Sequence, residues 1–311
     1  MEQRLLGDHG LQLSALGLGT RTWGLDTDPH EAKEILSLYA QAGGTTIEVV
    51  DDPFFREPLA TTGALLSEMG TKDWRLLLRS GALAPGVLPS RSVLLDSLDF
   101  SLKELGREHV DLWLLHGPRG GVPLEEILSA GETAWHSGRA RYVGIGNVGW
   151  WDAGSAVALA QAGGWTISAW AEPVSLLEAR LLSPQAAPLL QSGLGIIAGM
   201  PLAGGMLTGK YRHSTPPDSR ATSPRFKTEL SAYSEPGPRS VVEATCRAAE
   251  GLDRSPAQVA LTWARDEPGV TSAIVGPRNL RQAEHLLEID GWHLPTALRD
   301  VLAEVTERGR G

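Results

Sequence analysis

The feature that most constrains this chain is a repeated alternation of short apolar runs with segments of helical spacing. Such runs predict buried parallel strands, and the segments between them predict helices that cover a sheet. The expected strands end near Leu18, Glu48, Arg79, His116, Asn147, Trp170, Gly199 and Val275. Eight is the number of strands that closes around a side-chain-filled interior. We therefore expect one α/β domain over residues 1–311, a (β/α)₈ TIM barrel, rather than an open sheet.

Local signals predict where the other elements begin and end. Helices are expected over residues 29–42, 90–105, 124–137 and 152–162, and from Ser255-Pro256 onward. Ser90 and Ser255 suit N-caps, and Gly106 suits a C-terminal cap. A hairpin over residues 4–14, turning at Gly10, is expected to close the bottom of the barrel. The Gly- and Pro-rich stretch 211–238 lacks periodicity, which is typical of a functional lid or a disordered loop.

Composition excludes several classes of partner. A net charge of −9, without a dense Lys/Arg run, argues against nucleic acid. Because no apolar stretch approaches about 18 residues and no leader is evident, we expect no membrane partner. A single cysteine, Cys246, has no intrachain partner, which favours a buried core residue and a cytoplasmic location. The spacing of His, Cys and carboxylates suggests no metal site, and the oligomeric state stays unknown.

The barrel architecture selects candidate site residues, because active sites of such folds lie at the C-terminal ends of the strands. Glu48, His116, Asn147, Glu172 and Met200 are expected at this mouth, together with Arg79 or Ser80. Candidate substrate-binding residues are Trp23, Phe54, Ser80 and Trp170. Arg119, just after His116, suits either an anionic substrate or the surface.

Five segments, in order along the chain, resemble the aldo-keto reductases. They are Leu16 to Thr20 with Trp23-Gly24, Val110 to His116, Gly138 to Asn147, Pro201 to Tyr211, and Gly276 to Arg278 with Gln282. The resemblance spans nearly the whole chain and implies a small-molecule substrate and NADP(H) as cofactor. The implied cofactor-binding residues are Asn147, Leu202, Gly204, Gly205, Leu207, Gly209, Lys210, Gly276, Arg278 and Gln282.

The resemblance also shows where the chain departs from the family's catalytic set of Asp, Tyr, Lys and His. The Asp falls at Glu48, the Tyr at Pro53, and only His116 keeps its identity. Proline has no proton to donate, so the general acid is missing. Alternation places Leu76, Leu78 and Ser80 on one face, which favours Ser80 as the lysine position. Arg79 takes that position if the register differs by one residue.

Contacts with the nicotinamide and adenine are also replaced. The family's Ser-Asn pair falls at Gly146-Asn147, its Gln at Ala171, and its ring-stacking Tyr at Gly199. The Asn that contacts adenine falls at Leu286. Each lost contact costs about 1 kcal/mol, so NADP(H) binding is predicted to be weakened or lost.

Three functions fit these residues. The first is non-redox acid/base chemistry (dehydration, isomerisation or cyclisation) in natural-product tailoring, with Glu48 and His116 as the reacting pair and Arg79 as a catalytic cation. The second is an NADPH-dependent carbonyl or ene reductase in which His116 or a water supplies the proton. The third is a non-catalytic ligand-binding or regulatory protein. The sequence favours the first and does not identify the substrate.

Overall fold

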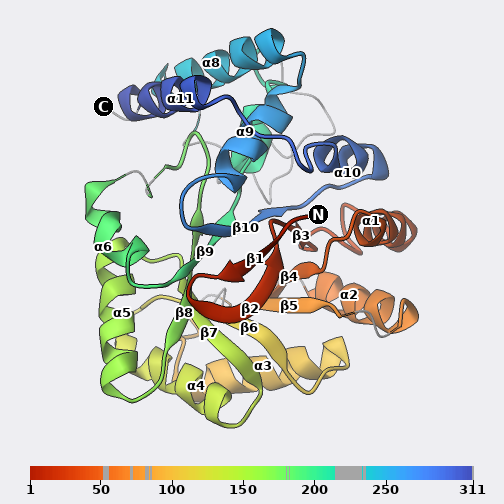
Figure 1. The fold of residues 1–311 in the computed structure, drawn as a ribbon. Helices are drawn as coiled ribbons and strands as arrows, with labels where there is room; N and C mark the ends of the chain where they lie inside the picture. The colour runs from red at the N-terminus through yellow and green to blue at the C-terminus, as the bar shows by residue number, and fades with distance from the viewer. Residues whose placement is uncertain are drawn as a thin grey trace.

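Eight parallel strands close into a barrel surrounded by helices, as the sequence predicts (Figure 1). The computed structural model describes residues 1–51, 56–70, 73–80, 84, 86–179, 181, 183–213, 233 and 236–309. The order around the barrel is β10-β3-β4-β5-β6-β7-β8-β9. The strands are β3 (Leu16–Gly19), β4 (Thr46–Asp51), β5 (Arg75–Ser80), β6 (Val110–His116), β7 (Ala140–Gly146), β8 (Ile167–Pro173), β9 (Gly195–Gly199) and β10 (Val270–Val275).

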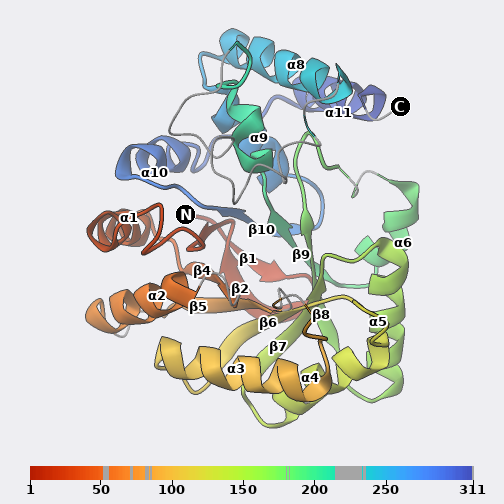
Figure 2. The ribbon, with the colours of Figure 1, turned by 180° about the vertical axis from the view of Figure 1, so that it is seen from behind.

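The helices lie outside the barrel, and both views show them around its circumference (Figures 1 and 2). They are α1 (Pro29–Gln41), α2 (Arg56–Glu68), α3 (Arg91–Leu105), α4 (Leu124–His136), α5 (Trp150–Ala162), α6 (Ala187–Leu190), α8 (Pro236–Leu252), α9 (Pro256–Arg265), α10 (Leu280–Leu287) and α11 (Thr296–Arg308). Short 3₁₀ segments are η2 (Pro184–Ala186) and η3 (Ala203–Thr208). No helix of the described ranges has the length and apolar composition needed to cross a membrane.

The predicted caps occur where the sequence places them. Ser90 accepts a hydrogen bond from the backbone N–H of Val93, and Ser255 forms a reciprocal capping box with Gln258. Gly106 ends α3 in the left-handed conformation, with φ of 62°. Strand β8 is three residues longer than predicted, because Ala171 to Pro173 pair with β9. The additional residues bring Glu172 to the barrel mouth.

Strand residues alternate between two buried layers. The inner layer, inside the barrel, includes Leu77, Leu112, Leu114, Ala169, Ala171, Ile197 and Ile274. The outer layer, between strands and helices, includes the neighbours Leu76 and Leu78. On β5 the inward positions are therefore Leu77 and, two residues later, Arg79.

An N-terminal hairpin of β1 (Gln3–Leu6) and β2 (His9–Ser14) adds three leucines to the inner layer: Leu6, Leu11 and Leu13. The prediction that it turns at Gly10 is wrong, because Gly10 lies within β2 and the chain turns at Gly7-Asp8. Gly7 has φ of 56°, and a Cβ there would lie 2.1 Å from the carbonyl oxygen of Gly193. Only glycine tolerates that combination.

Two sequence-based expectations concern the region after η3. Most of the proposed lid, residues 214–232, lies outside the described residues, and α8 already begins at Pro236. Cys246 lies in α8 and is buried, with 3% of its surface exposed.

Candidate active site

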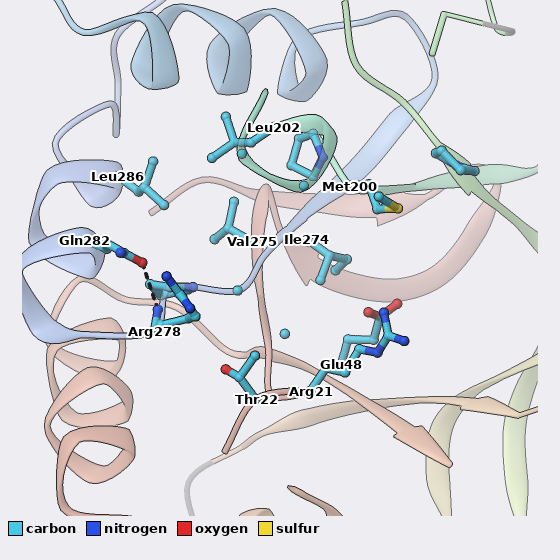
Figure 3. A pocket seen from close by; sticks show the side chains of 18 of the residues that line it. Arg21, Thr22, Glu48, Met200, Leu202, Ile274, Val275, Arg278, Gln282 and Leu286 are labelled. Atoms are coloured by element: carbon cyan, nitrogen blue, oxygen red, sulfur yellow. Dashed lines mark hydrogen bonds between the residues drawn. The ribbon is translucent and has the colours of Figure 1, made fainter. Parts of the chain in front are cut away.

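A cavity of about 740 Å³ opens at the C-terminal ends of the strands. One end contains Glu48, Arg79, His116 and Asn147, which we call the floor cluster. The other end contains Gly204, Gly205, Lys210, Arg278 and Gln282, which we call the cradle. Figure 3 shows Glu48 at one end of the cavity and Arg278 with Gln282 at the other. The cavity therefore joins the ends of β4 to β7 to the two loops that follow β9 and β10.

Within the floor cluster, Glu48 and Arg79 form an ion pair between neighbouring strands. Nε and Nη2 of Arg79 donate to the same oxygen, Oε1 of Glu48, at 3.1 and 2.6 Å. The two side chains are only 11% and 10% exposed. A buried guanidinium needs such a partner, because an unpaired charge there would lose its solvation without compensation.

The barrel register places Arg79 in the cavity and Ser80 outside it. Ser80 is fully buried in the outer layer, where its Oγ accepts a hydrogen bond from Trp113 Nε1 at 2.9 Å. The expectation that Ser80 faces the mouth and contacts substrate is therefore wrong. Leu76, Leu78 and Ser80 do share one face, but that face packs against helices. Arg79 therefore faces the cavity, as expected if the register differs by one residue from the one that favoured Ser80.

His116 ends β6 and contacts Asn147, which follows β7. Asn147 Nδ2 lies 3.0 Å from His116 Nε2, and Asn147 has a left-handed φ of 54°. Burial, with the nearby positive charges of Arg79 and Arg119, lowers the pKa of His116 to about 3. The imidazole is therefore neutral at physiological pH. Its Nε2 can then accept from the Asn147 amide, which leaves the proton on Nδ1.

Glu172, at the extended end of β8, fixes the backbone beside the floor cluster. Its side chain is buried, and Oε1 accepts a hydrogen bond of 2.7 Å from the backbone N–H of Val148. This contact holds the turn that carries Asn147 against β8. Glu172 lines the cavity.

The cradle is built on glycines with left-handed backbone. Gly204 and Gly205 have φ of 66° and 98°, and a Cβ on Gly205 would lie 3.3 Å from Lys210 Nζ. On the facing loop, the backbone N–H of Arg278 donates to Gln282 Oε1 at 2.9 Å, a contact visible in Figure 3. Arg278, two residues before the start of α10, and Lys210 both line the cavity, which favours an anion such as a phosphate.

Most of the residues selected from the sequence meet in this cavity. The lining residues among them are Glu48, Arg79, His116, Asn147, Leu202, Gly204, Gly205, Lys210, Gly276, Arg278 and Gln282. Leu207 and Gly209 lie behind the lining: Leu207 is fully buried, and a Cβ on Gly209 would lie 2.9 Å from Cys246 Sγ. Neither is among the described residues that line the cavity.

The predicted aromatic walls are not among the lining residues. Trp23 and Trp170 are almost completely buried in the outer layer, and Trp170 Nε1 donates to the carbonyl oxygen of Val148 at 3.3 Å. Trp170 lies on the outward face of β8, which alternation alone could not identify. Phe54 and Pro53 lie outside the described residues.

The sequence did not select some residues that line the cavity. Arg21 and Thr22 lie on the loop after β3, and Ser255 and His285 lie near the cradle. His285 Nε2 is 2.6 Å from Ser255 Oγ. The position of Arg21 and Thr22 at a strand's C-terminal end was an available signal. Ser255 was assigned only as a helix cap, a role it also has.

No phenol is available in the described part of the cavity. The chain has four tyrosines, Tyr39, Tyr142, Tyr211 and Tyr233, and none is among the described lining residues. Tyr39, for example, is buried behind β3 and β4, where its hydroxyl bonds to Ser14, Leu16 and Thr46. The ionisable side chains of the floor cluster are therefore those of Arg79, Glu48 and His116.

Comparison with known proteins gives one family. The model of the Aldo/keto reductase family matches residues 15–295. L-glyceraldehyde 3-phosphate reductase of Escherichia coli (strain K12) is 29% identical over 317 residues, which cover 91% of this chain and 86% of that protein. Aldo-keto reductase YhdN of Bacillus subtilis (strain 168) is 27% identical, with coverage of 94% and 90%. A probable voltage-gated potassium channel subunit beta of Oryza sativa subsp. japonica is 28% identical, with coverage of 93% and 92%.

Proposed function

This chain belongs to the aldo/keto reductase family, and on that premise we propose that it binds NADP(H) and reduces a small carbonyl or enone substrate without a tyrosine acid. The observation that carries the proposal is the single cavity that joins the floor cluster to the cradle. Two of the similar proteins compared above are named as reductases.

The cradle fits the anionic part of such a cofactor. Lys210 and Arg278 bring positive charge from the two loops that line it, and the absence of a Cβ on Gly205 leaves room beside Lys210 Nζ. Leu202 and Leu286 add apolar surface suited to flat rings. These residues would hold NADPH, which supplies the hydride when bound.

At the floor cluster, Arg79 supplies the electrostatic stabilisation. A guanidinium stays charged at any physiological pH, so it can stabilise negative charge that develops on a substrate oxygen. Glu48 holds that guanidinium in place through Nε and Nη2. Neutral His116 orients the substrate by donating from Nδ1, and a water molecule delivers the proton.

The same geometry disfavours the non-redox chemistry that the sequence ranked first. An acid/base pair needs groups whose pKa values lie near the working pH. Burial and neighbouring cations lower the pKa of His116 to about 3, which makes imidazolium rare at neutral pH. Glu48 already accepts both hydrogen bonds from Arg79. Reduction requires neither side chain to cycle its proton.

Fluorescence titration with NADPH, followed by NADPH oxidation with aldehydes, ketones and enones, tests the proposal. Wild type should bind and oxidise NADPH. Arg278→Ala should weaken binding roughly 10- to 100-fold, as expected for one lost charge-assisted contact. Arg281→Ala, an exposed arginine on α10, is the matched control and should change little.

Two outcomes would contradict the proposal. If wild type does not bind NADPH, the cradle has another ligand. If it binds NADPH tightly but oxidises it with no member of the substrate panel, a regulatory role is favoured over catalysis. The similarity to a channel subunit beta makes that second outcome worth measuring.

A further inference from the structure

We propose that the floor cluster selects substrates that carry a carboxylate, and that Nη1 of Arg79 is the group that binds it. This inference deepens the proposed function by naming a substrate class. Its binding step, however, is independent of NADPH and can be measured alone. Three observations carry it: the hydrogen bonds of Arg79, the two glycines beside its guanidinium, and the charges around it.

The first observation is that Arg79 uses only part of its hydrogen-bonding capacity. Both hydrogen bonds that it donates within the described chain go to Glu48 Oε1, from Nε and Nη2. Its Nη1 donates none to the described residues. A guanidinium has five N–H groups in a fixed plane, so Arg79 can hold Glu48 and still present donors to a second acceptor.

The second observation is that the guanidinium reaches across the mouth to strand ends without side chains. A Cβ on Gly146, at the end of β7, would lie 3.2 Å from Arg79 Nη1. A Cβ on Gly199, at the end of β9, would lie 3.9 Å from Nη2. The two glycines thus leave room for the guanidinium, and the cavity lining includes Arg79, Gly199 and Asn147.

The third observation is an excess of positive charge on the His116 side of the guanidinium. Among the described residues, Arg79 and Arg119 are the charged groups that lower the pKa of His116. Glu48 binds the edge of Arg79 formed by Nε and Nη2, and Glu172 accepts a hydrogen bond from the Val148 N–H. Arg21 adds a further cation to the cavity lining.

A carboxylate matches these features better than a neutral group. Its two oxygens lie in one plane and accept from adjacent guanidinium donors, a geometry that is both strong and specific. A neutral amide of equal shape offers one acceptor and adds an N–H that faces the cationic donors. The pair oxamate and oxamide differs in this respect alone and provides the probe.

Isothermal titration of oxamate and oxamide, with and without NADPH, tests the inference. Wild type should bind oxamate at least 10-fold more tightly than oxamide. Arg79→Gln should weaken oxamate binding roughly 10- to 100-fold. Glu48→Gln should tighten it several-fold, because the competing carboxylate is removed while the cation stays. Arg308→Gln, on an exposed arginine of α11, should change neither affinity.

Arg79→Gln and Glu48→Gln are expected to change oxamate affinity in opposite directions, so a general loss of structure cannot explain both results. If Arg79→Gln fails to fold with Glu48 unpaired, Glu48→Gln and the double variant Glu48→Gln/Arg79→Gln still give an answer. Equal affinities for oxamate and oxamide would overturn the inference, as would unchanged or weaker oxamate binding in Glu48→Gln. Inorganic phosphate that competes at the same site with higher affinity would also overturn it.

The test separates this inference from the proposed function. Arg79-dependent oxamate binding in a protein that does not bind NADPH would support the carboxylate site and contradict the reductase. Turnover of neutral carbonyls with NADPH in a protein that does not bind oxamate would support the reductase and contradict the carboxylate site.

Discussion

At the scale of single residues, the floor cluster combines a permanent cation, a carboxylate and an imidazole that is neutral at physiological pH. Arg79 cannot be deprotonated in a protein, so it can stabilise charge but cannot transfer a proton. The ion pair with Glu48 compensates the burial of the Arg79 guanidinium, and His116 contributes a neutral imidazole ring. In the proposed reduction these three side chains bind and polarise a substrate oxygen, and a water molecule delivers the proton.

We predict that His116 does not titrate near neutral pH. Burial and the charges of Arg79 and Arg119 lower its pKa from 6.5 to about 3, so its ring signals in ¹H–¹⁵N NMR should stay constant from about pH 8 to about pH 5. Because the folded pKa is depressed, the stability from the neutral ring is complete above about pH 6.5 and falls as pH drops toward 3.

His116→Gln removes that acid-sensitive contribution. Its free energy of unfolding should decline less between about pH 6.5 and about pH 4 than that of wild type, by about 2–3 kcal/mol. Urea denaturation at the two pH values measures the difference. An inflection of the His116 signals between about pH 6 and 7 would contradict this account of the floor.

At the scale of elements, the cradle depends on the backbone of η3. Gly205→Ala places a Cβ at φ of 98° and 3.3 Å from Lys210 Nζ, which costs about 1–2 kcal/mol and displaces the lysine. We expect roughly 10-fold weaker NADPH binding in a fluorescence titration. Gly251→Ala, in α8 with open space around it, is the control and should leave binding unchanged. Equal affinity of both variants would show that η3 does not contact the cofactor.

The junction between α9 and β10 contains a buried carboxylate with a raised pKa. Glu267 is 5% exposed, and burial raises its pKa to about 7, although Arg299 lies 3.7 Å away. Because the folded pKa exceeds the unfolded one, the stability from the protonated acid is complete below about pH 4.5 and is lost as pH rises through about 7.

Glu267→Gln keeps the shape of the protonated acid without this loss. Its free energy of unfolding should exceed that of wild type by about 1–3 kcal/mol more at about pH 8.5 than at about pH 4.5. Urea denaturation at both pH values measures the change. The exposed Glu304→Gln on α11 should show no such pH dependence. A constant difference across pH would mean that Glu267 is ionised in the fold.

At the scale of the whole molecule, the N-terminal hairpin completes the inner core. Leu6 is fully buried with Leu77 and Leu112 inside the barrel, whereas its neighbour Leu5 is 55% exposed. Leu6→Ala should lower the free energy of unfolding by about 2–4 kcal/mol, and Leu5→Ala by less than about 1 kcal/mol. Chemical denaturation compares the two. Equal losses would show that the hairpin does not fill the barrel.

The sequence by itself determined the barrel and the composition of its mouth. The local signals are the alternation of strands and helices, the serine caps and the glycine after α3. Such signals can be identified in the sequence without the tertiary structure. Strand ends follow from the same signals, so most of the candidate residues could be selected before any coordinates. Glu48, His116 and Asn147 were found in this way, whereas Arg278 came from the resemblance to the aldo-keto reductases.

Only the tertiary structure decided which face of each strand is the inside. Alternation divides residues 76–80 into two sets that face opposite sides of the strand. It does not say which set faces the barrel interior, because that depends on the strands and helices that pack on either side. The closed barrel turned Arg79 inward onto Glu48, and Ser80 and Trp170 outward. The neutral state of His116 is likewise a property of its surroundings, because desolvation and neighbouring charge depend on residues distant in the sequence.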